Sequence, residues 1–495
     1  MGTTINKPQI STLGELRAQG YQPKSIREEL RDNLLLFLAK GENVFKGIYG
    51  YEHSVIPDLE RAILSRHHIN LLGLRGQAKT RLARQMVDLL DPWIPFLPVT
   101  DLNEDPLSPI SGLAKAYVEE MGDKAEVRWL HRSERYFEKL ATPDVSVADL
   151  IGDLDPIKAA NLKIPYSDVR AIHFGMIPRA NRSLFVINEL PDLQARIQVA
   201  LFNILQEGDI QIRGFNLRLP IDIQFVFTAN PEDYTNRGSI VTPLKDRIGS
   251  QIITHYPPDI QTASQITAQE ARLTNSQKSK IELPGLAGEL LEQIGFEARK
   301  SELVDSKSGV SARLSVSAFE NLYSTAERRL VKNGEKQTTI RLSDFMGTLP
   351  SIVGKVELVY EGEQEGAAGV AEALLGAAIK ALVAKYLPSM EKLKNTSVNH
   401  PYHGILNWFS EGNEINLAFD ASNTQYENAF KTCKPLLDFI KNLKNQSFSD
   451  HKFFIMELVL WALSEHAKLN RDKLIDGFQF GDLFGAYLQG LGKED

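Results

Sequence analysis

The sequence is poor in several features that would define a class of protein on their own. It contains one cysteine, Cys433, which excludes an internal disulfide and a zinc site built on cysteines. No stretch of about 18 residues is continuously apolar, and the longest candidate, residues 367–387, is interrupted by charged residues at amphipathic spacing. Residues 1–21 lack the apolar run of a signal peptide. We therefore expect a cytoplasmic protein that does not interact with a membrane.

Positive charge does not dominate either. The formal net charge is −7 at pH 7, whereas sequence-independent binding of nucleic acid requires clustered Lys and Arg. We therefore expect no nucleic-acid partner. The hydrophobic fraction of 43% and the charged fraction of 24% are those of a globular protein, and 495 residues suffice for about three domains.

Short apolar segments alternate with helical segments in the first half of the chain. Residues 12–41 predict a helix, and its apolar face contains Ile26, Leu30, Leu34, Leu35 and Leu38. The segments with the length and composition of buried strands are residues 68–73, 183–187, 223–228 and 251–255. Residues 210–219 alternate with period two around Gly214 and predict a hairpin. Buried strands separated by helices predict the α/β class, with a doubly wound parallel sheet.

The second half of the chain has a different pattern. After Pro257 and Pro258, the segments that predict helices are residues 259–274, 284–300, 312–332 and 366–387. The tail is mixed and richer in aromatic residues, and we expect a mostly helical module of unknown role. The expected organisation is an N-terminal helical segment (1–45), a sheet domain (46–258), a helical domain (259–395) and a C-terminal module (396–495).

A phosphate-binding loop follows the first predicted strand. The pattern G-x-x-x-x-G-K-[ST] is matched by the segment Gly73-Leu74-Arg75-Gly76-Gln77-Ala78-Lys79-Thr80, which Arg81 follows. One position differs: Ala78 stands where the pattern has its second glycine. In this pattern the loop N–H groups and the helix N-terminus bind phosphates, the Lys reaches the β- and γ-phosphate oxygens, and the hydroxyl holds Mg²⁺. The methyl group of Ala78 crowds the loop and is tolerated if this residue has a negative φ. The segment predicts binding of ATP with Mg²⁺.

Three polar residues follow the later strands, in the order expected of an ATPase site. Glu189 ends the strand at 184–188 and is placed to polarise an attacking water. Asn188 precedes it, where an aspartate usually orders the magnesium shell. An amide oxygen still accepts a hydrogen bond from a magnesium-bound water but brings no charge, so slow hydrolysis is expected. Asn230 ends the next strand and is placed to orient water near the γ-phosphate.

Two arginines are candidates for contact with the γ-phosphate. Arg247 lies just before the last strand, where it is able to reach the nucleotide of a neighbouring subunit and stabilise the transition state. The alternative is a solvated arginine or a pair with Asp246. Arg313 opens a predicted helix in the second half, from which it is able to report the state of the nucleotide, with a similar alternative.

With these five motifs in order, the chain resembles the AAA+ superfamily and, within it, the magnesium-chelatase and MoxR branch. The segments that resemble this branch are the run into the strand of Glu189, the hairpin before Asn230 and the start of an insert, at residues 174–182, 205–214 and 150–155. The resemblance covers roughly residues 45–390. Residues 113–149 exceed the minimal core, the segment Trp129 to Tyr136 is unexplained, and residues 396–495 carry no motif of the family.

The resemblance implies an αβα nucleotide domain followed by a helical lid, assembled as a ring that is commonly a hexamer, with ATP between subunits. The implied roles are phosphate binding for Lys79, magnesium coordination for Thr80 and Asn188, catalysis for Glu189, nucleotide sensing for Asn230 and Arg313, an arginine finger for Arg247, and adenine contact for Ile48 and Tyr49. Family members commonly work with a partner that carries a von Willebrand A domain, which this chain does not resemble.

The leading interpretation is therefore an ATPase that remodels or activates a partner protein. Two alternatives stay open: an assembly scaffold that binds ATP with weak hydrolysis, and the motor subunit of a magnesium chelatase. An activator of sigma-54 transcription is disfavoured, because the sequence contains no GAFTGA-type loop.

Overall fold

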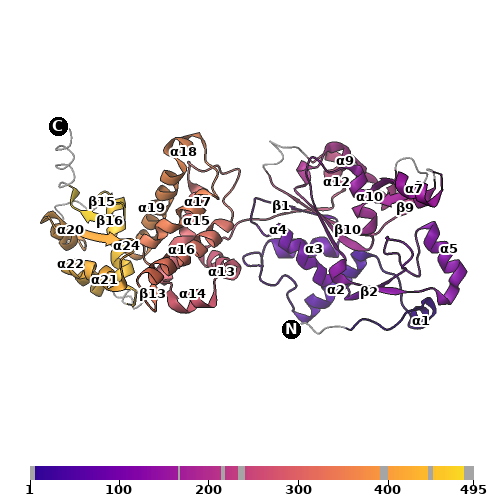
Figure 1. Cartoon of the computed structure of the whole chain (residues 1–495), viewed down its shortest axis with the longest axis horizontal. Helices are drawn as coiled ribbons and strands as arrows, with labels where there is room; N and C mark the ends of the chain where they lie inside the picture. Colours follow the sequence, from indigo (N-terminus) through magenta and orange to yellow (C-terminus); the bar gives the residue numbers. More distant parts are fainter. Residues whose placement is uncertain are drawn as a thin grey trace. The chain divides into compact units, whose positions relative to one another are not determined.

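The computed structural model describes residues 6–165, 168–212, 218–231, 240–390, 400–443 and 450–483. The chain divides into two compact units, Met1–Tyr256 and Pro257–Asp495, which are described separately (Figure 1). The division lies close to the boundary expected after residue 258. The boundary expected after residue 395 falls inside the second unit.

The first unit is built on a parallel sheet. Its five strands are β1 (Ile69–Leu72), β4 (Tyr136–Leu140), β7 (Ser183–Asn188), β10 (Ile223–Ala229) and β11 (Ser250–Ile253). Their order across the sheet is β11-β1-β10-β7-β4, and every neighbouring pair is parallel. Consecutive strands therefore need crossover connections, and helices cover both faces of the sheet, as the sequence predicted.

The side chains of the central strands alternate between two hydrophobic clusters. Val186 and Val226 pack with helices α2 (Ile26–Lys40), α3 (Val55–Leu64) and α4 (Lys79–Gln85). Phe185 and Phe225 point to the opposite face and pack with α9 (Ala195–Ala200), α10 (Phe202–Glu207) and α12 (Thr242–Arg247). Figure 1 shows the two groups of helices on either side of the strands. Burial on both faces explains the continuous apolar sequences of β7 and β10.

Strand β4 was missed by the sequence analysis, which predicted only four buried strands. Its sequence, Tyr-Phe-Glu-Lys-Leu, is not an apolar run, and none of its residues is fully buried, because it lies at the edge of the sheet. It belongs to residues 113–149, which were predicted to exceed the minimal core, so part of that segment belongs to the sheet itself. The rest of that segment contains α5 (Gly112–Met121) and β3 (Arg128–His131), which pairs antiparallel with β2 (Trp93–Phe96). Trp129 donates its indole N–H to the carbonyl of Ile10 at 2.8 Å.

The N-terminal segment forms two helices, α1 (Leu13–Ala18) and α2, rather than the single predicted helix. Thr12 and Ser25 each start a capping box, and Gly41 ends α2 in the left-handed conformation. The predicted apolar face is half correct. Ile26, Leu30 and Leu34 are buried, whereas Leu35 and Leu38 are 41% and 42% exposed.

Two expected additions to the sheet are present. The insert before β7 consists of α6 (Val147–Leu150), β5 (Gly152–Leu154), α7 (Pro156–Leu162), β6 (Ile172–Phe174) and α8 (Met176–Arg179), with β5 and β6 antiparallel. The hairpin consists of β8 (Asp209–Gln211) and β9 (Arg218–Pro220). Its turn around Gly214 lies outside the described residues.

The second unit is mainly helical. Its first part contains α13 (Ile260–Glu270), α14 (Asn275–Lys280), α15 (Gly285–Lys300), α16 (Arg313–Lys332), α17 (Leu349–Val353), α18 (Tyr360–Glu365), α19 (Ala367–Tyr386), the 3-10 helix η6 (Ser343–Thr348), and the paired strands β12 (Ile281–Glu282) and β13 (Thr338–Thr339). By length and composition alone α19 is apolar enough to cross a membrane. It packs against α15 and α24 (Lys452–Glu465) within the core of this unit, which explains its hydropathy.

The last part of the second unit adds helices and a small sheet. The elements are α20 (His403–Ser410), β14 (Ile415–Ala418), α21 (Asn423–Lys431), α22 (Lys434–Asn442), α24 (Lys452–Glu465), β15 (Asn470–Lys473) and β16 (Gly477–Gly481). The three strands form an antiparallel sheet in the order β14-β16-β15, which the expected mostly helical module did not include. Residues on both sides of position 395 share one hydrophobic core, and Cys433 is buried in it.

Candidate nucleotide-binding site

The predicted phosphate-binding loop connects the carboxyl end of β1 to the start of α4. In parallel α/β sheets this edge is where ligands bind. Gly73 donates its N–H to the carbonyl of Ala229 at 3.1 Å, which joins the loop to β10. A Cβ on Gly73 would lie 1.9 Å from Thr254 Oγ1 and 2.2 Å from Gln77 Oε1, so a larger residue here would displace these two side chains.

The loop turns through two left-handed residues. Gly76 has φ +75°, and Ala78 has φ +55° with ψ +15°. A negative φ, the condition under which the methyl group is tolerated without strain, is therefore not met: the chain keeps a left-handed backbone at this position and places a methyl group on it. A non-glycine residue in this conformation costs about 1–2 kcal/mol. Ala78 also precedes α4 directly as its N-cap.

Two buried side chains hold the loop in place. Gln77 Oε1 accepts a hydrogen bond from Thr254 Oγ1 at 2.7 Å. The hydroxyl of Tyr51 lies 3.0 Å from the carbonyl of Gln77 and 2.7 Å from that of His255. The segment before the loop is thereby fixed to it. Within that segment Ile48 is buried and Tyr49 is 37% exposed, and their contact with adenine stays a prediction.

Lys79, Asn230 and Glu189 form a connected chain of hydrogen bonds. The Lys79 ammonium donates to the carbonyls of Gly73 and Leu74 and to Asn230 Oδ1, the last at 2.8 Å. Asn230 Nδ2 donates to Glu189 Oε2, also at 2.8 Å. Because an ammonium only donates and a carboxylate only accepts, these contacts fix the orientation of the amide. Three residues predicted from separate motifs thus meet at one edge of the sheet.

A second set of contacts surrounds Asn188. Its Oδ1 accepts from the hydroxyls of Thr80, at 3.4 Å, and Thr228, at 3.1 Å. Its Nδ2 donates to Glu138 Oε1, at 2.6 Å. The sequence predicted a role for neither Thr228 nor Glu138. A threonine in a buried strand carried no signal of its own, and Glu138 lies on the strand that was not recognised.

The turn after β7 aims the carboxylate of Glu189. This residue has φ +55° and ψ +51°, which is uncommon for a residue other than glycine, and its N–H donates to Thr228 Oγ1 at 3.2 Å. Strained backbone of this kind is found most often at functional sites. Thr228 therefore supports both Asn188 and Glu189.

The contacts of the two predicted arginines do not include the residues of this cluster. Arg247 ends α12, donates to Gln206 Oε1 at 2.9 Å and to the carbonyl of Pro243 at 2.8 Å, and lies over the Phe202 ring. Arg313 is exposed at the first residue of α16, in the second unit. Arg75 is exposed on the loop, and Arg81 is half-buried in α4.

The residues at this edge fit a magnesium ion bound together with phosphates. Mg²⁺ prefers oxygen ligands and in phosphate sites uses only one or two protein groups, with waters and phosphates completing its shell. Thr80 supplies a hydroxyl and Asn188 an amide oxygen, and the carboxylates of Glu189 and Glu138 lie next to the same group of contacts. Among the described residues no group of three or more His, Cys, Asp or Glu side chains is arranged to hold a metal alone.

Comparisons with known proteins give partial matches to this chain. The Sigma-54 interaction domain family matches residues 163–250. The chain is 26% identical over 146 residues to the magnesium-chelatase 38 kDa subunit of Cereibacter sphaeroides, covering 28% of this chain and 41% of that protein. It is 23% identical over 173 residues to the hydrogenase transcriptional regulatory protein HoxA of Cupriavidus necator, covering 34% and 36%. The chain thus spans less than half the length of either relative.

Among solved structures, the complex between subunits BchI and BchD of magnesium chelatase aligns with a TM-score of 0.34 and 17% identity, over 65% of this chain and 98% of that one. At this level of agreement the fold is defined by the strand order and not by the alignment. The ordered motifs, the P-loop on a five-stranded parallel sheet and the sequence matches support an AAA+ ATPase of the magnesium-chelatase-like branch.

Proposed function

We propose that this chain binds ATP with Mg²⁺, hydrolyses it within an oligomeric ring, and uses the cycle to remodel or activate a partner protein, as MoxR-type ATPases do. The observation that carries the proposal is the chain of hydrogen bonds from Lys79 through Asn230 to Glu189. It connects the group expected on the phosphates with the group expected on the attacking water. The resemblance to the MoxR branch supports a partner with a von Willebrand A domain.

In this proposal each residue has a defined task in hydrolysis. The loop N–H groups and Lys79 bind the phosphate oxygens, and Thr80 and Asn188 would hold the magnesium ion, which neutralises phosphate charge when bound. Glu189 accepts a proton from water as the water oxygen bonds to the γ-phosphorus. The bond from that phosphorus to the β–γ bridging oxygen breaks, which leaves ADP and phosphate. Asn230 keeps Glu189 in place for this transfer.

The ring part of the proposal concerns Arg247. Its guanidinium is half-buried and is held by Gln206 and Pro243, at the end of α12. An arginine fixed in this way on a subunit surface is suited to reach a phosphate of the neighbouring subunit, where a guanidinium raises the rate by stabilising negative charge. Because Arg247 is half-exposed, it could make this contact without any rearrangement of the buried core.

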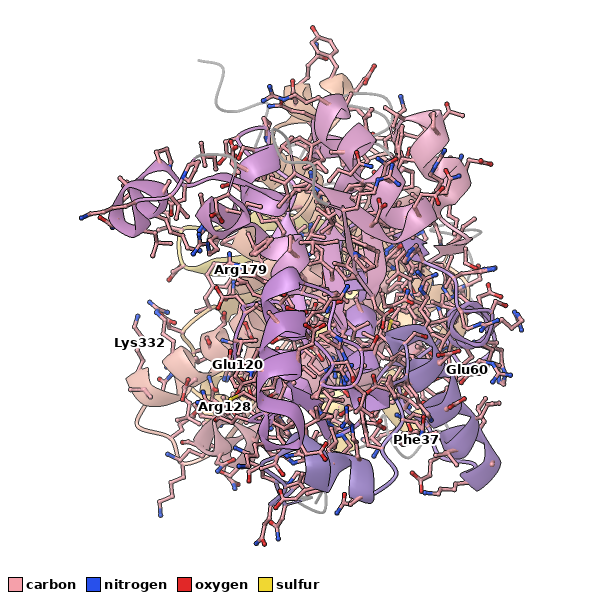
Figure 2. All side chains as sticks on the ribbon, turned by 90° about the vertical axis from the view of Figure 1, so that its right-hand side faces the viewer. Phe37, Glu60, Glu120, Arg128, Arg179 and Lys332 are labelled. Atoms are coloured by element: carbon pink, nitrogen blue, oxygen red, sulfur yellow. The ribbon has the colours of Figure 1, made fainter. Side chains whose placement is uncertain are left out.

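ATP turnover of the purified chain tests the proposal. We expect magnesium-dependent release of phosphate that Glu189→Gln lowers at least about 100-fold while nucleotide affinity stays within about threefold. The matched control is Glu120→Gln, at an exposed position of α5 labelled in Figure 2, which should leave turnover unchanged. Nucleotide binding without turnover in the wild type, alone and with a partner, would leave only the scaffold alternative.

A second candidate is the motor subunit of a magnesium chelatase. The match to the 38 kDa subunit of that enzyme favours it, although it covers 28% of this chain. Reconstitution separates the two candidates: a chelatase motor should restore magnesium insertion into a porphyrin when added to the remaining chelatase subunits. The absence of a GAFTGA-type loop argues against extending the sigma-54 match at residues 163–250 to transcription activation.

A further inference from the structure

Glu138 is a carboxylate in direct contact with Asn188. It lies on β4, whose register pairs it with Val186 and pairs Leu140 with Asn188. Side chains two residues apart on a strand share a face, so Glu138 and Asn188 project to the same side of the sheet. The distance from Glu138 Oε1 to Asn188 Nδ2 is 2.6 Å.

The contacts of the Asn188 amide determine how it is oriented. Glu138 Oε1 is a carboxylate oxygen and can only accept, so it faces the Nδ2 group. The two hydroxyls, of Thr80 and Thr228, then face Oδ1. The amide therefore lies between a negative charge on β4 and the hydroxyl expected to bind magnesium at the start of α4.

We propose that Glu138 is a positioning residue that supplies, through the Asn188 amide, the negative charge that position 188 itself lacks. The inference rests on the proposed binding of ATP with Mg²⁺. An amide that donates to a carboxylate is polarised toward greater negative charge on its oxygen, because hydrogen bonds in a chain strengthen one another. Asn188 Oδ1 thereby becomes a better acceptor for Thr80 or for a magnesium-bound water, and the carboxylate adds a direct attraction to the cation.

Arg84 partly offsets the negative charge of Glu138 by binding its other carboxylate oxygen. Its guanidinium donates to Glu138 Oε2 at 2.7 Å, and its side chain is 65% exposed, whereas that of Glu138 is 26% exposed. The pair lies at the surface and is weakened by solvent screening. Glu138 Oε1 remains directed at Asn188, so one carboxylate connects an exposed arginine with the nucleotide site.

The test compares nucleotide affinity with and without the metal. The dissociation constant of ADP is measured in EDTA and in excess Mg²⁺. The value in EDTA divided by the value in Mg²⁺ gives the coupling between metal and nucleotide, and a higher ratio means stronger coupling. We expect Glu138→Gln to lower this ratio about five- to tenfold while affinity in EDTA stays within about twofold. Arg84→Gln removes the positive charge beside the carboxylate, which keeps its hydrogen bonds from Tyr136 and Asn188, and should raise the ratio by up to about threefold.

The matched control is Glu126→Gln. Glu126 is an exposed carboxylate that accepts from Arg128 Nε at 2.7 Å, so this variant makes the same change in charge at a similar ion pair elsewhere in the first unit; Arg128 is labelled in Figure 2. A ratio for Glu138→Gln equal to that of Glu126→Gln overturns the inference. A wild type that binds no ADP in either condition overturns the proposed function instead, and the inference with it.

Moving the charge separates an electrostatic role from a structural one. Asn188→Asp alone places two carboxylates in contact, so that one must take up a proton or turn away, and we expect little gain in the ratio. The double variant Asn188→Asp/Glu138→Gln pairs a carboxylate at 188 with an amide at 138 and should return the ratio at least to the wild-type value. A ratio for the double variant as low as that of Glu138→Gln alone would contradict the proposal.

Discussion

Both units of this protein bury a cluster of polar side chains, and the two clusters differ in whether they are complete. In the second unit Arg329 and Asp344 form an ion pair with side chains 1% and 2% exposed. Glu457 accepts from the N–H groups of Leu342 and Ser343 and from the hydroxyl of Tyr426. Each of these charges has its partners within the unit, at positions that solvent does not reach.

The cluster of the first unit ends at the open edge of the sheet. Lys79 and Asn230 are buried, but Thr80, Asn188 and Glu189, to which they lead, are only half-buried. A buried charge needs a partner wherever it lies, so burial alone does not indicate a ligand. The difference between the two clusters shows what marks a binding site. It is a series of hydrogen-bonded polar side chains that ends at oxygen atoms accessible to a ligand.

The largest expected effect comes from breaking the complete cluster. Arg329→Ala leaves Asp344 buried without its partner and should lower the free energy of unfolding of the second unit by about 3–5 kcal/mol. Hydrogen exchange read peptide by peptide assigns the loss to residues 257–495. The neighbouring Arg328 has a side chain that is 63% exposed and pairs with Asp420, so Arg328→Ala should cost at most about 1 kcal/mol. Equal losses in the two variants would contradict the distinction between a buried and an exposed ion pair.

The next effect comes from breaking the open cluster. Lys79→Ala removes the charge expected on the phosphates and should weaken ATP binding at least about 100-fold, measured by titration calorimetry. Its effect on unfolding should be smaller than that of Arg329→Ala, because the partners it leaves, two carbonyls and the Asn230 amide, carry no charge. Lys115→Ala, at an exposed position of α5, is the control and should bind ATP as the wild type does. If Lys79→Ala instead unfolded the first unit without changing affinity, the open cluster would be structural as well.

A pH titration sharpens the same comparison. Burial raises the pKa of Glu457 from 4.5 to about 7, so the folded state holds this proton more tightly than the unfolded state does. The free energy of unfolding of the second unit should therefore fall as pH rises from about 4.5 through about 7, by about 3 kcal/mol, and level off above that pH. In Glu457→Gln that part of the slope should vanish. Since burial also raises the pKa of Glu292, the difference between wild type and variant isolates Glu457.

The sequence predicted most of the fold of the first unit because its central strands are buried on both faces. Their apolar runs, and the polar residue that ends each, carried enough signal to place Lys79, Glu189 and Asn230 at one edge. The edge strand β4 carried no such signal, because a half-exposed strand admits charged residues. Glu138 was lost with it, since a glutamate inside an unrecognised strand looks like any surface residue.

Two other differences have local causes. The break between α1 and α2 was encoded in two capping boxes, Thr12 with Glu15 and Ser25 with Glu28, which the apolar periodicity of residues 12–41 obscured. The conformation of Ala78 was not encoded in its side chain at all. It follows from the path of the loop between β1 and α4, which is determined by tertiary contacts such as that of Gln77 with Thr254.

The smallest expected effect tests this residue directly. Ala78→Gly removes the penalty of a Cβ at φ +55° and should raise the free energy of unfolding of the first unit by about 1 kcal/mol, after the entropy that glycine adds to the unfolded chain. Ala116→Gly, at an exposed helical position in α5, makes the same chemical change and should lower it by about 1 kcal/mol. Urea denaturation of both variants measures the two signs. Destabilisation by both would show that residue 78 has a right-handed backbone in solution, whereas opposite signs show that the loop keeps the geometry of a phosphate-binding loop although its second signature glycine is missing.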